Sequence, residues 1–275
     1  MLTLDNVSKT YRTGAFGTGT CNAVCDVSFS IEPGEVIALI GESGSGKSTI
    51  GRMILRLSAV TSGSITLDGV DVSTIRRGRL KDYYARVQGV FQDPFSSYNP
   101  IFKADRVFSM IRQGYLSGLS ASEWHTKLTA SLDAVSLSPE DVLHKYPHQL
   151  SGGQLQRLLV ARALLLDIEF LVADEIISML DASTRIDVLN LLGDLKERGL
   201  GILFITHDLS LGNYIGDRAV ILHKGAVVED GPTEQVFSKP QSPYTQMLLD
   251  AVPRLHERWG EPHSNGAPPT QTDDE

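Results

Sequence analysis

Residues 36–49 read VIALIGESGSGKST, and this stretch decides the fold of the chain. The first five residues are apolar and lie between Gly34 and Gly41, which is the pattern of a short strand buried on both faces of a parallel sheet. A glycine-rich turn follows, and residues 49–55 then begin a helix. The order of strand, GxxxxGK[ST] turn and helix is the setting that a phosphate-binding P-loop requires.

The residue types of this turn fit a nucleotide triphosphate. Glycines let the backbone adopt positive φ and approach a ligand closely, so that successive N–H groups can surround a phosphate at the positive end of the helix dipole. Lys47 adds a positive charge on the phosphates, and the Ser48 hydroxyl is the expected Mg²⁺ ligand. The nucleotide-binding residues predicted in the turn are Gly41, Ser43, Gly44, Ser45, Gly46, Lys47, Ser48 and Thr49.

Composition narrows the class of function. The chain has 275 residues with 25 basic and 33 acidic side chains, a net charge of −8, and this balance argues against a nucleic-acid partner. The two cysteines, Cys21 and Cys25, are too few for a zinc or iron–sulfur site. The N-terminus lacks the pattern of a secretory signal, and no apolar run is long enough to span a bilayer. We therefore expect a soluble, cytoplasmic chain whose membrane attachment would come from a partner.

The first quarter of the chain predicts antiparallel β-structure beside the P-loop strand. Residues 2–11 alternate loosely as an edge strand, and residues 13–22 are polar and glycine-rich, as in a loop. Residues 24–31 alternate as a half-buried strand. Residues 63–72 predict a hairpin, with residues 68–69 (Asp-Gly) at its turn.

The following part alternates between strands and helices. Residues 86–91 predict a strand, and about 95–166 predict a mostly helical insertion. Strands at 169–174 and 201–206 flank a helix at about 183–197. Strands that alternate with helices indicate a parallel sheet.

The C-terminal part completes the expected fold class. A short helix starts at about residue 209, a hairpin covers 218–229, and residues 260–275 are too polar to pack and are expected to be disordered. The fold class that we expect is α/β: a P-loop NTPase core with a mostly parallel sheet, an N-terminal antiparallel β subdomain and a helical subdomain insertion.

Two carboxylates follow the predicted strand at 169–174. Asp174, at the carboxyl end of the strand, is where an acid that holds Mg²⁺ should lie beside the P-loop. Glu175 follows directly and is placed to take a proton from an attacking water. Two adjacent acids can be ordinary loop residues, but behind a P-loop the functional interpretation is favoured.

Residues 150–154 read LSGGQ and precede a predicted amphipathic helix at 155–166. Ser151 is a natural helix cap, yet two glycines directly after a cap weaken a helix. Glycine fits this position if an anion must lie against the helix N-terminus. A second anion-binding helix end is not expected in a one-site kinase or GTPase, but it is expected if a second subunit completes the nucleotide site.

These motifs, in their order along the chain, resemble those of ABC-transporter ATP-binding subunits over about residues 1–253. The matching elements are residues 41–49, Gln92, residues 150–154, Asp174-Glu175, residues 178–181 and His207. Other stretches resemble the ATPases of oligopeptide and dipeptide importers, a group that includes nickel and oligosaccharide importers. They are QDPFSSYNP (92–100), YPHQL (146–150), ITHDL (205–209) and PQSPYT (240–245).

The resemblance implies a role for each matching residue. Tyr11 would stack on the adenine ring, and Gln92 would contact Mg²⁺ and the attacking water while its loop senses the permease. His207 would hold the γ-phosphate and orient Glu175, and Asp181 would cross the dimer interface. The residues expected to contact the γ-phosphate held by the opposite subunit are Ser151, Gly153 and Gln154, and Gly152 is expected among the nucleotide-binding residues. The expected catalytic residues are Glu175, His207, Gln92 and Lys47, and the expected metal ligands are Ser48, Gln92 and Asp174.

Two positions depart from the family pattern. Ile176 stands where most members have proline, and Met179 stands where most have alanine. Both neighbour the chemistry without taking part in it, so we expect a competent site. The C-terminal cysteine cluster of some peptide-importer ATPases is absent from the sequence, so no iron–sulfur centre is expected.

The resemblance further implies an ABC ATPase domain at 1–253, with a helical subdomain at about 95–166, a family-specific segment at 238–259 and the tail at 260–275. It implies an importer subunit that uses ATP and Mg²⁺ in a head-to-tail dimer, with a similar but distinct mate favoured over a homodimer. The partners would be transmembrane permease subunits and, indirectly, an extracytoplasmic solute-binding protein, and the location peripheral, on the cytoplasmic face of the membrane. The alternative is a soluble ABC ATPase with a non-transport role, and the solute stays open between peptide, nickel and oligosaccharide.

Overall fold

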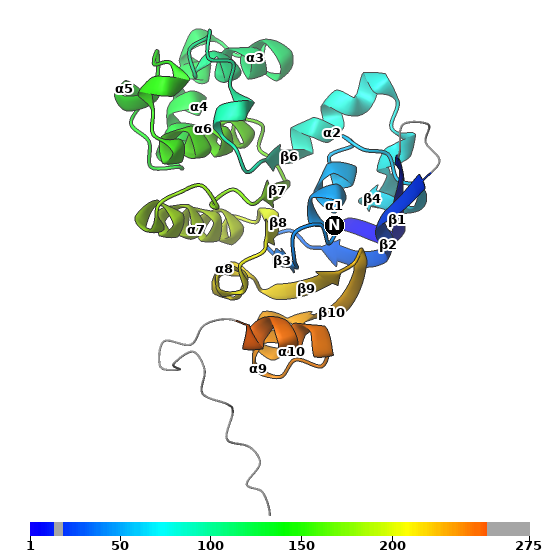
Figure 1. Cartoon of the computed structure of the whole chain (residues 1–275). Coiled ribbons are helices and arrows are strands. Elements are labelled where there is room, and N and C mark those ends of the chain that lie inside the picture. Colours follow the sequence, from blue (N-terminus) through cyan, green and yellow to red (C-terminus); the bar gives the residue numbers. More distant parts are fainter. Residues whose placement is uncertain (14–18, 252–275) are drawn as a thin grey trace, which may run out of the picture.

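A computed structural model of the chain describes residues 1–13 and 19–251, which form two β-sheets and the helices around them (Figure 1). The expected disordered tail at 260–275, and the end of the expected family-specific segment, lie outside the described residues. None of the helices in the described part combines the length and the apolar character that a membrane span needs.

The N-terminal sheet is antiparallel, as predicted. Its order is β2-β1-β4-β5, and its strands are β1 (Leu2–Thr13), β2 (Gly19–Ile31), β4 (Ser62–Leu67) and β5 (Val70–Asp71). The β4–β5 turn has φ of 50° at Asp68 and 78° at Gly69. Positive φ at both central residues is the conformation for which Asp-Gly is preferred in hairpins, so this prediction is confirmed.

The loop predicted at residues 13–22 is wrong at both of its ends. Strand β1 continues to Thr13, and β2 already begins at Gly19, with Tyr11 paired to Cys21. The hydroxyl of Thr10 donates to the Asn22 side chain at 2.8 Å across the two strands. Exposed strand pairs of this kind are stabilised by polar side chains, so polarity did not distinguish this ladder from a loop.

The central sheet carries the P-loop strand in its middle. Its order is β10-β9-β3-β8-β7-β6, and all neighbouring strands are parallel except the β10–β9 pair. The strands are β3 (Val36–Ile40), β6 (Val87–Val90), β7 (Phe170–Asp174), β8 (Gly201–Thr206), β9 (Arg218–His223) and β10 (Ala226–Pro232). Every residue of β3, β7 and β8 is buried, which agrees with their unbroken apolar runs.

The helices fall into groups around this sheet. Helix α1 (Lys47–Ile54) follows β3, and α2 (Leu80–Arg86) precedes β6. The helical lobe between β6 and β7 contains α3 (Arg106–Tyr115), α4 (Ala121–Asp133), α5 (Pro139–Val142) and α6 (Gly152–Leu164). The later helices are α7 (Ala182–Glu197), α8 (Leu209–Ile215), α9 (Thr233–Ser238) and α10 (Pro243–Asp250). Short 3₁₀ turns occur at Val72–Thr74, Arg77–Arg79, Phe95–Ser97 and Pro147–Gln149.

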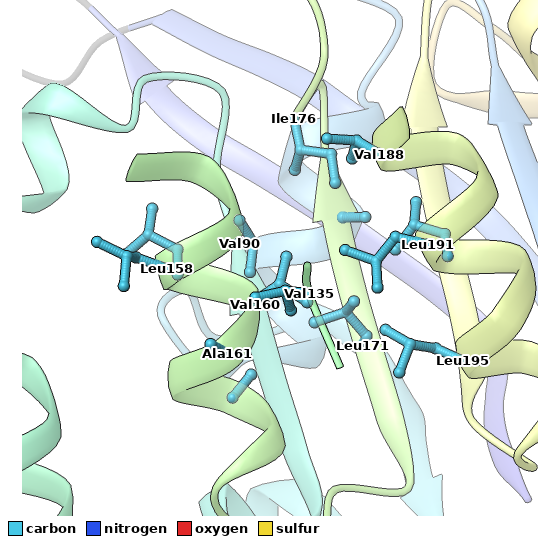
Figure 2. Packing of buried hydrophobic residues seen from close by; sticks show 14 of the residues in the cluster. Val90, Val135, Leu158, Val160, Ala161, Leu171, Ile176, Val188, Leu191 and Leu195 are labelled. Carbon is cyan, nitrogen blue, oxygen red and sulfur yellow. The ribbon is translucent and has the colours of Figure 1, made fainter. Parts of the chain in front are cut away.

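The helix expected at 155–166 begins earlier, at Gly152, because Ser151 caps it. The largest apolar cluster joins this helix, the central sheet and α7 (Figure 2). Val160 on α6, Leu171 on β7 and Leu195 on α7 are all buried in it. Burial of each leucine contributes roughly 2 kcal/mol. The lobe that carries LSGGQ is therefore packed against the strand that ends in the two carboxylates.

Candidate active site

Four neighbouring parallel strands place several of the predicted site residues at one edge of the central sheet. Ile40 at the end of β3 pairs with Thr206 of β8, and Asp174 of β7 pairs with Ile205. Val90 of β6 pairs with Ala173 of β7. The P-loop, His207, the two carboxylates and Gln92 thus all follow carboxyl ends of strands, which is where the functional groups of open α/β sheets gather.

Glycine is required at three positions of the P-loop for two different structural reasons. Gly44 and Gly46 have φ of 84° and 107°, conformations that other residues rarely adopt. Gly41 does not have positive φ, contrary to the expectation for all the glycines. A Cβ at Gly41 would instead overlap the Leu222 carbonyl oxygen at the end of β9. The turn is therefore shaped by its own backbone and by the strand beside it.

Lys47 lies inside the turn that it follows. Its Nζ donates to the carbonyl oxygens of Gly41 at 2.6 Å and Glu42 at 2.8 Å, and only 4% of the residue is exposed. Burial lowers the pKa of Lys47, and the carboxylates of Glu175 and Asp174 act in the opposite direction. A buried lysine without a full ion pair is a cation held ready for an anionic ligand.

Ser48 and Asp174 meet beside Lys47. The Ser48 hydroxyl donates to Asp174 Oδ1 at 3.0 Å, and Asp174 is 7% exposed. Burial raises the pKa of Asp174, while the hydrogen bond from Ser48 acts in the opposite direction. A hydroxyl and a carboxylate are oxygen donors of the kind that Mg²⁺ prefers, so the pair fits this ion.

Gln92 lies at the same edge of the sheet, two residues after β6. Its side chain is exposed and forms no hydrogen bond with any part of the chain that the structure describes. The structure therefore brings Ser48 and Asp174 into contact, while the contact of Gln92 with a metal or a water stays a prediction.

Glu175 and His207 form a pair across strands β7 and β8. His207 Nδ1 lies 3.1 Å from Glu175 Oε1, with the imidazole more exposed than the carboxylate. Glu175 has φ of 50°, and its N–H donates to the Ile205 carbonyl at 3.0 Å. A left-handed glutamate costs roughly 1 kcal/mol, and the hydrogen bond from its N–H to Ile205 fixes the backbone in this conformation.

A cavity of about 400 Å³ connects the P-loop with this pair. Leu248 of α10 lines it and is a residue that the sequence did not predict in the site. The segment around it was noticed only as a family feature, since nothing in its pattern relates it to residues 200 positions earlier. The lining residues are Ile40, Gly41, Glu42, Ser43, Glu175, His207, Leu209 and Leu248.

In the LSGGQ segment, Ser151 and Gln154 form hydrogen bonds with each other, within the same chain. Ser151 Oγ accepts from the Gln154 N–H at 3.1 Å, and Gln154 Oε1 accepts from the Ser151 N–H at 2.9 Å. This is a capping box, which stabilises a helix N-terminus without any ligand. A Cβ on Gly153 would overlap the Thr184 methyl group, whereas a Cβ on Gly152 would have its nearest neighbours at 3.8 Å. Internal packing therefore explains Gly153 but not Gly152.

Asp181 and Met179 lie in the segment between β7 and α7. Asp181 caps α7, because its carboxylate accepts from the Ser183 hydroxyl at 2.6 Å and from the N–H and hydroxyl of Thr184. These hydrogen bonds lower the pKa of Asp181. Met179 is exposed. The role of Asp181 across an interface stays a prediction, because the structure shows it only as a helix cap.

Tyr11, the expected adenine-stacking residue, lies at the end of β1 near the P-loop helix. Its hydroxyl is 3.5 Å from Ser58 Oγ, and Lys9 Nζ lies 5.0 Å from the ring centroid. Hydrogen bonding to Ser58, and to Thr49 of α1, lowers the pKa of Tyr11 against the effect of burial. The ring is partly exposed beside α1.

The two segments predicted to bind anions, residues 150–154 and residues 41–49, are not joined by hydrogen bonds within the described part of the chain. One chain thus presents a P-loop with its carboxylates, and elsewhere a capped LSGGQ helix end. A strand, a glycine turn with lysine, and two acids at the end of another strand of the same sheet define the class of P-loop nucleotide-hydrolysing α/β proteins.

Comparison with known proteins specifies the family. A family model described as ABC transporter matches residues 24–178, and one described as oligopeptide/dipeptide transporter, C-terminal region, matches residues 228–274. The chain belongs to the ABC transporter family. This confirms the resemblance, the expected fold class and the expectation of an ATPase.

Relatives agree with this assignment. A putative peptide import ATP-binding protein of Brucella ovis is 41% identical over 256 residues, which are 92% of this chain and 78% of that protein. The oligopeptide transport ATP-binding protein OppF of Bacillus subtilis is 41% identical over 237 residues, covering 86% of this chain and 77% of OppF. A solved structure of the ATP-binding cassette MJ0796, a dimer in a post-hydrolysis state with ADP and Pi, has a TM-score of 0.75 and 30% identity. It covers 85% of this chain and 99% of that one.

Proposed function

We propose that the chain is the ATP-hydrolysing subunit of an importer that takes up peptides or similar small solutes through a membrane permease. One observation carries the proposal: Lys47, the Ser48–Asp174 pair and the Glu175–His207 pair meet at one sheet edge. The match of residues 228–274 to the C-terminal region of oligopeptide and dipeptide transporters supports this type of import.

Each group has a distinct part in the proposed hydrolysis. Lys47 leaves the carbonyls of Gly41 and Glu42 and stabilises the charge on the phosphates, helped by the loop N–H groups. Glu175 takes the proton of the attacking water. His207 donates its Nδ1–H to the Glu175 carboxylate, because an ionised carboxylate only accepts hydrogen bonds, and so fixes its orientation.

Mg²⁺ would be held by Ser48, Asp174 and the side-chain oxygen of Gln92. When bound, the ion neutralises charge on the phosphate oxygens. The Ser48–Asp174 hydrogen bond keeps both oxygens close to the P-loop before any ligand arrives.

Two chains would close head-to-tail over two ATP molecules. The lack of hydrogen bonds between residues 150–154 and residues 41–49 in the described part of the chain supports this arrangement, because each half needs a complement from another chain. Gly152 supports it as well, since a Cβ there would meet Leu180 and Phe95 only at 3.8 Å, so packing within the chain does not require glycine at this position. Asp181 would then face the partner, and a similar but distinct ATPase is favoured as the mate.

The permease would dock on the helical lobe at the cytoplasmic face of the membrane. Large apolar side chains are exposed after Gln92 and on α3, which supports a protein-contact surface there. They are Phe95, Ile101, Phe102 and Met110. We also propose residues 1–253 as the ATPase domain, with 95–166 as its helical subdomain.

Reconstitution tests this function. The chain, its mate and the permease in liposomes, with the proposed solute-binding protein on the opposite side of the membrane, should move a labelled oligopeptide into the compartment that the ATPase faces, and only when that compartment contains Mg²⁺-ATP. The same complex with Glu175→Gln should not transport. Transport of nickel or an oligosaccharide instead would change the solute, and the absence of ATP-dependent pairing of the subunits would overturn the mechanism.

A further inference from the structure

Helix α10 and the turn between β9 and β10 contact the P-loop. Figure 1 shows α9 and α10 beneath β9 and β10, at the end of the molecule opposite the lobe of α3–α6. The Gly225 N–H in the turn donates to the Ser45 carbonyl at 2.9 Å. Leu222, at the end of β9, brings its carbonyl oxygen against Gly41. The turn after β9 and the end of β9 thus contact the P-loop at Ser45 and Gly41.

Tyr244 is the α10 side chain whose hydroxyl group faces the P-loop, at the backbone of Glu42. Its ring and that of His223, the last residue of β9, have centroids 3.8 Å apart with the planes tilted by 40°. Its hydroxyl oxygen is buried, faces the backbone of Glu42 and has no hydrogen bond of good geometry among the described residues. Burial raises the pKa of Tyr244.

Glu42 links Tyr244 to the P-loop lysine. The Glu42 carbonyl accepts from Lys47 Nζ at 2.8 Å and from the Ser45 N–H at 3.1 Å. When Lys47 turns to a phosphate, this carbonyl loses a charged donor, and the loop needs another support to keep its shape. Tyr244, stacked on His223 and against the backbone of Glu42, is in place to give that support.

We propose that Tyr244 is a positioning residue for ATP binding, which acts through the backbone of Glu42, and that Leu248 on the same helix is part of the wall of the nucleotide cleft. Leu248 lines the same cavity as Glu175 and His207, one helical turn after Tyr244. The region matched as a transporter C-terminal region therefore contributes directly to nucleotide affinity. This inference rests on the proposal that residues 41–49 bind the triphosphate.

Binding of a fluorescent ATP analogue to the purified full-length chain tests the inference, together with thermal unfolding without nucleotide. Tyr244→Ala should weaken binding by about tenfold while the unfolding temperature falls by less than about 4 °C. Tyr244→Phe keeps the ring stacked on His223 and should recover most of the affinity. Met247→Ala, on the same helix but with a side chain that is 52% exposed, is the matched control and should bind as the wild type does.

Two results would overturn the inference: Tyr244→Ala binding within twofold of the wild type, or Met247→Ala weakening binding as much as Tyr244→Ala. Lys47→Ala separates this failure from a failure of the proposed site. If Lys47→Ala abolishes binding while Tyr244→Ala does not change it, only the role of α10 is wrong. If Lys47→Ala binds normally, residues 41–49 do not hold the triphosphate.

Discussion

His207 Nδ1 lies 3.1 Å from Glu175 Oε1, although the two residues follow different strands of the central sheet. The pairing of β7 with β8 sets this distance, because Asp174 is in register with Ile205 and each functional residue follows within two positions. The hydrogen bond from the Glu175 N–H to the Ile205 carbonyl fixes the backbone at the same place. The geometry of the proposed base is thus a property of the sheet, and each member can be tested separately.

Glu175→Gln removes the proposed base with little change in shape. An amide cannot take a proton from water, so kcat should fall at least about 100-fold while ATP still binds. Phosphate release measures turnover, and size-exclusion chromatography with ATP should show a stable dimer that the wild type loses. Glu234→Gln, an exposed residue at the start of α9, is the matched control. A Glu175→Gln chain with near-normal turnover would remove Glu175 from the role of base.

His207→Ala removes the donor to Glu175 and should lower kcat by about tenfold or more, with ATP affinity less affected. His207→Asn places an amide N–H near the position of Nδ1 and should recover part of the loss. His207→Gln extends the amide toward the position of Nε2 instead. If Gln recovers activity and Asn does not, the histidine acts mainly on phosphate and not through Glu175.

The sequence was sufficient to predict features that depend on a local pattern or on the general geometry of parallel sheets. The apolar runs of β3, β7 and β8 mark strands, and parallel strands align their carboxyl ends, so Lys47 and Asp174 could be predicted to meet. The left-handed φ of Glu175 had no signal, because glutamate does not mark that conformation as glycine does. The contact of Tyr244 with Glu42 had none either, since it joins segments about 200 residues apart.

Sequence-based prediction was wrong where polar side chains form hydrogen bonds that stabilise a strand or a helix end. Asn22 is exposed in a strand and paired with Thr10, so its polarity was mistaken for a loop. Ser151 and Gln154 satisfy one another in a capping box, so the start of α6 lies before the apolar run that marked it. In both cases the partner of a polar side chain, which the sequence does not identify, decided the conformation.

Asp174→Asn should stabilise the chain in the absence of ligands and abolish its ATPase activity. Because the pKa of Asp174 is raised in the fold, the native state binds the proton more tightly than the unfolded state, and the ionised form destabilises the fold at neutral pH. Thermal unfolding at pH 7 should therefore show a higher midpoint for Asp174→Asn. The difference should shrink as the pH falls through the raised pKa toward the unfolded value of about 3.9. An equal or lower midpoint at pH 7 would contradict this account.

Gly152 and Gly153 provide a matched pair for the proposed dimer. A Cβ at Gly153 overlaps the Thr184 methyl group, and the Thr184 hydroxyl donates to Asp181, which opposes a change of rotamer, so Gly153→Ala should cost roughly 1–3 kcal/mol of unfolding free energy. A Cβ at Gly152 has room, with its nearest neighbours at 3.8 Å, so Gly152→Ala should leave the stability of the single chain nearly unchanged.

The decisive measurement for this pair is ATP-dependent association. If the γ-phosphate of a partner's ATP lies against the α6 N-terminus, the methyl group of Gly152→Ala occupies that space, and dimers trapped in a Glu175→Gln background should be lost. Light scattering with and without ATP measures the dimer, and thermal unfolding verifies that the variant is folded. A stable Gly152→Ala chain that still forms the ATP dimer would mean that the helix end does not approach the phosphate, and the head-to-tail arrangement would have to be replaced.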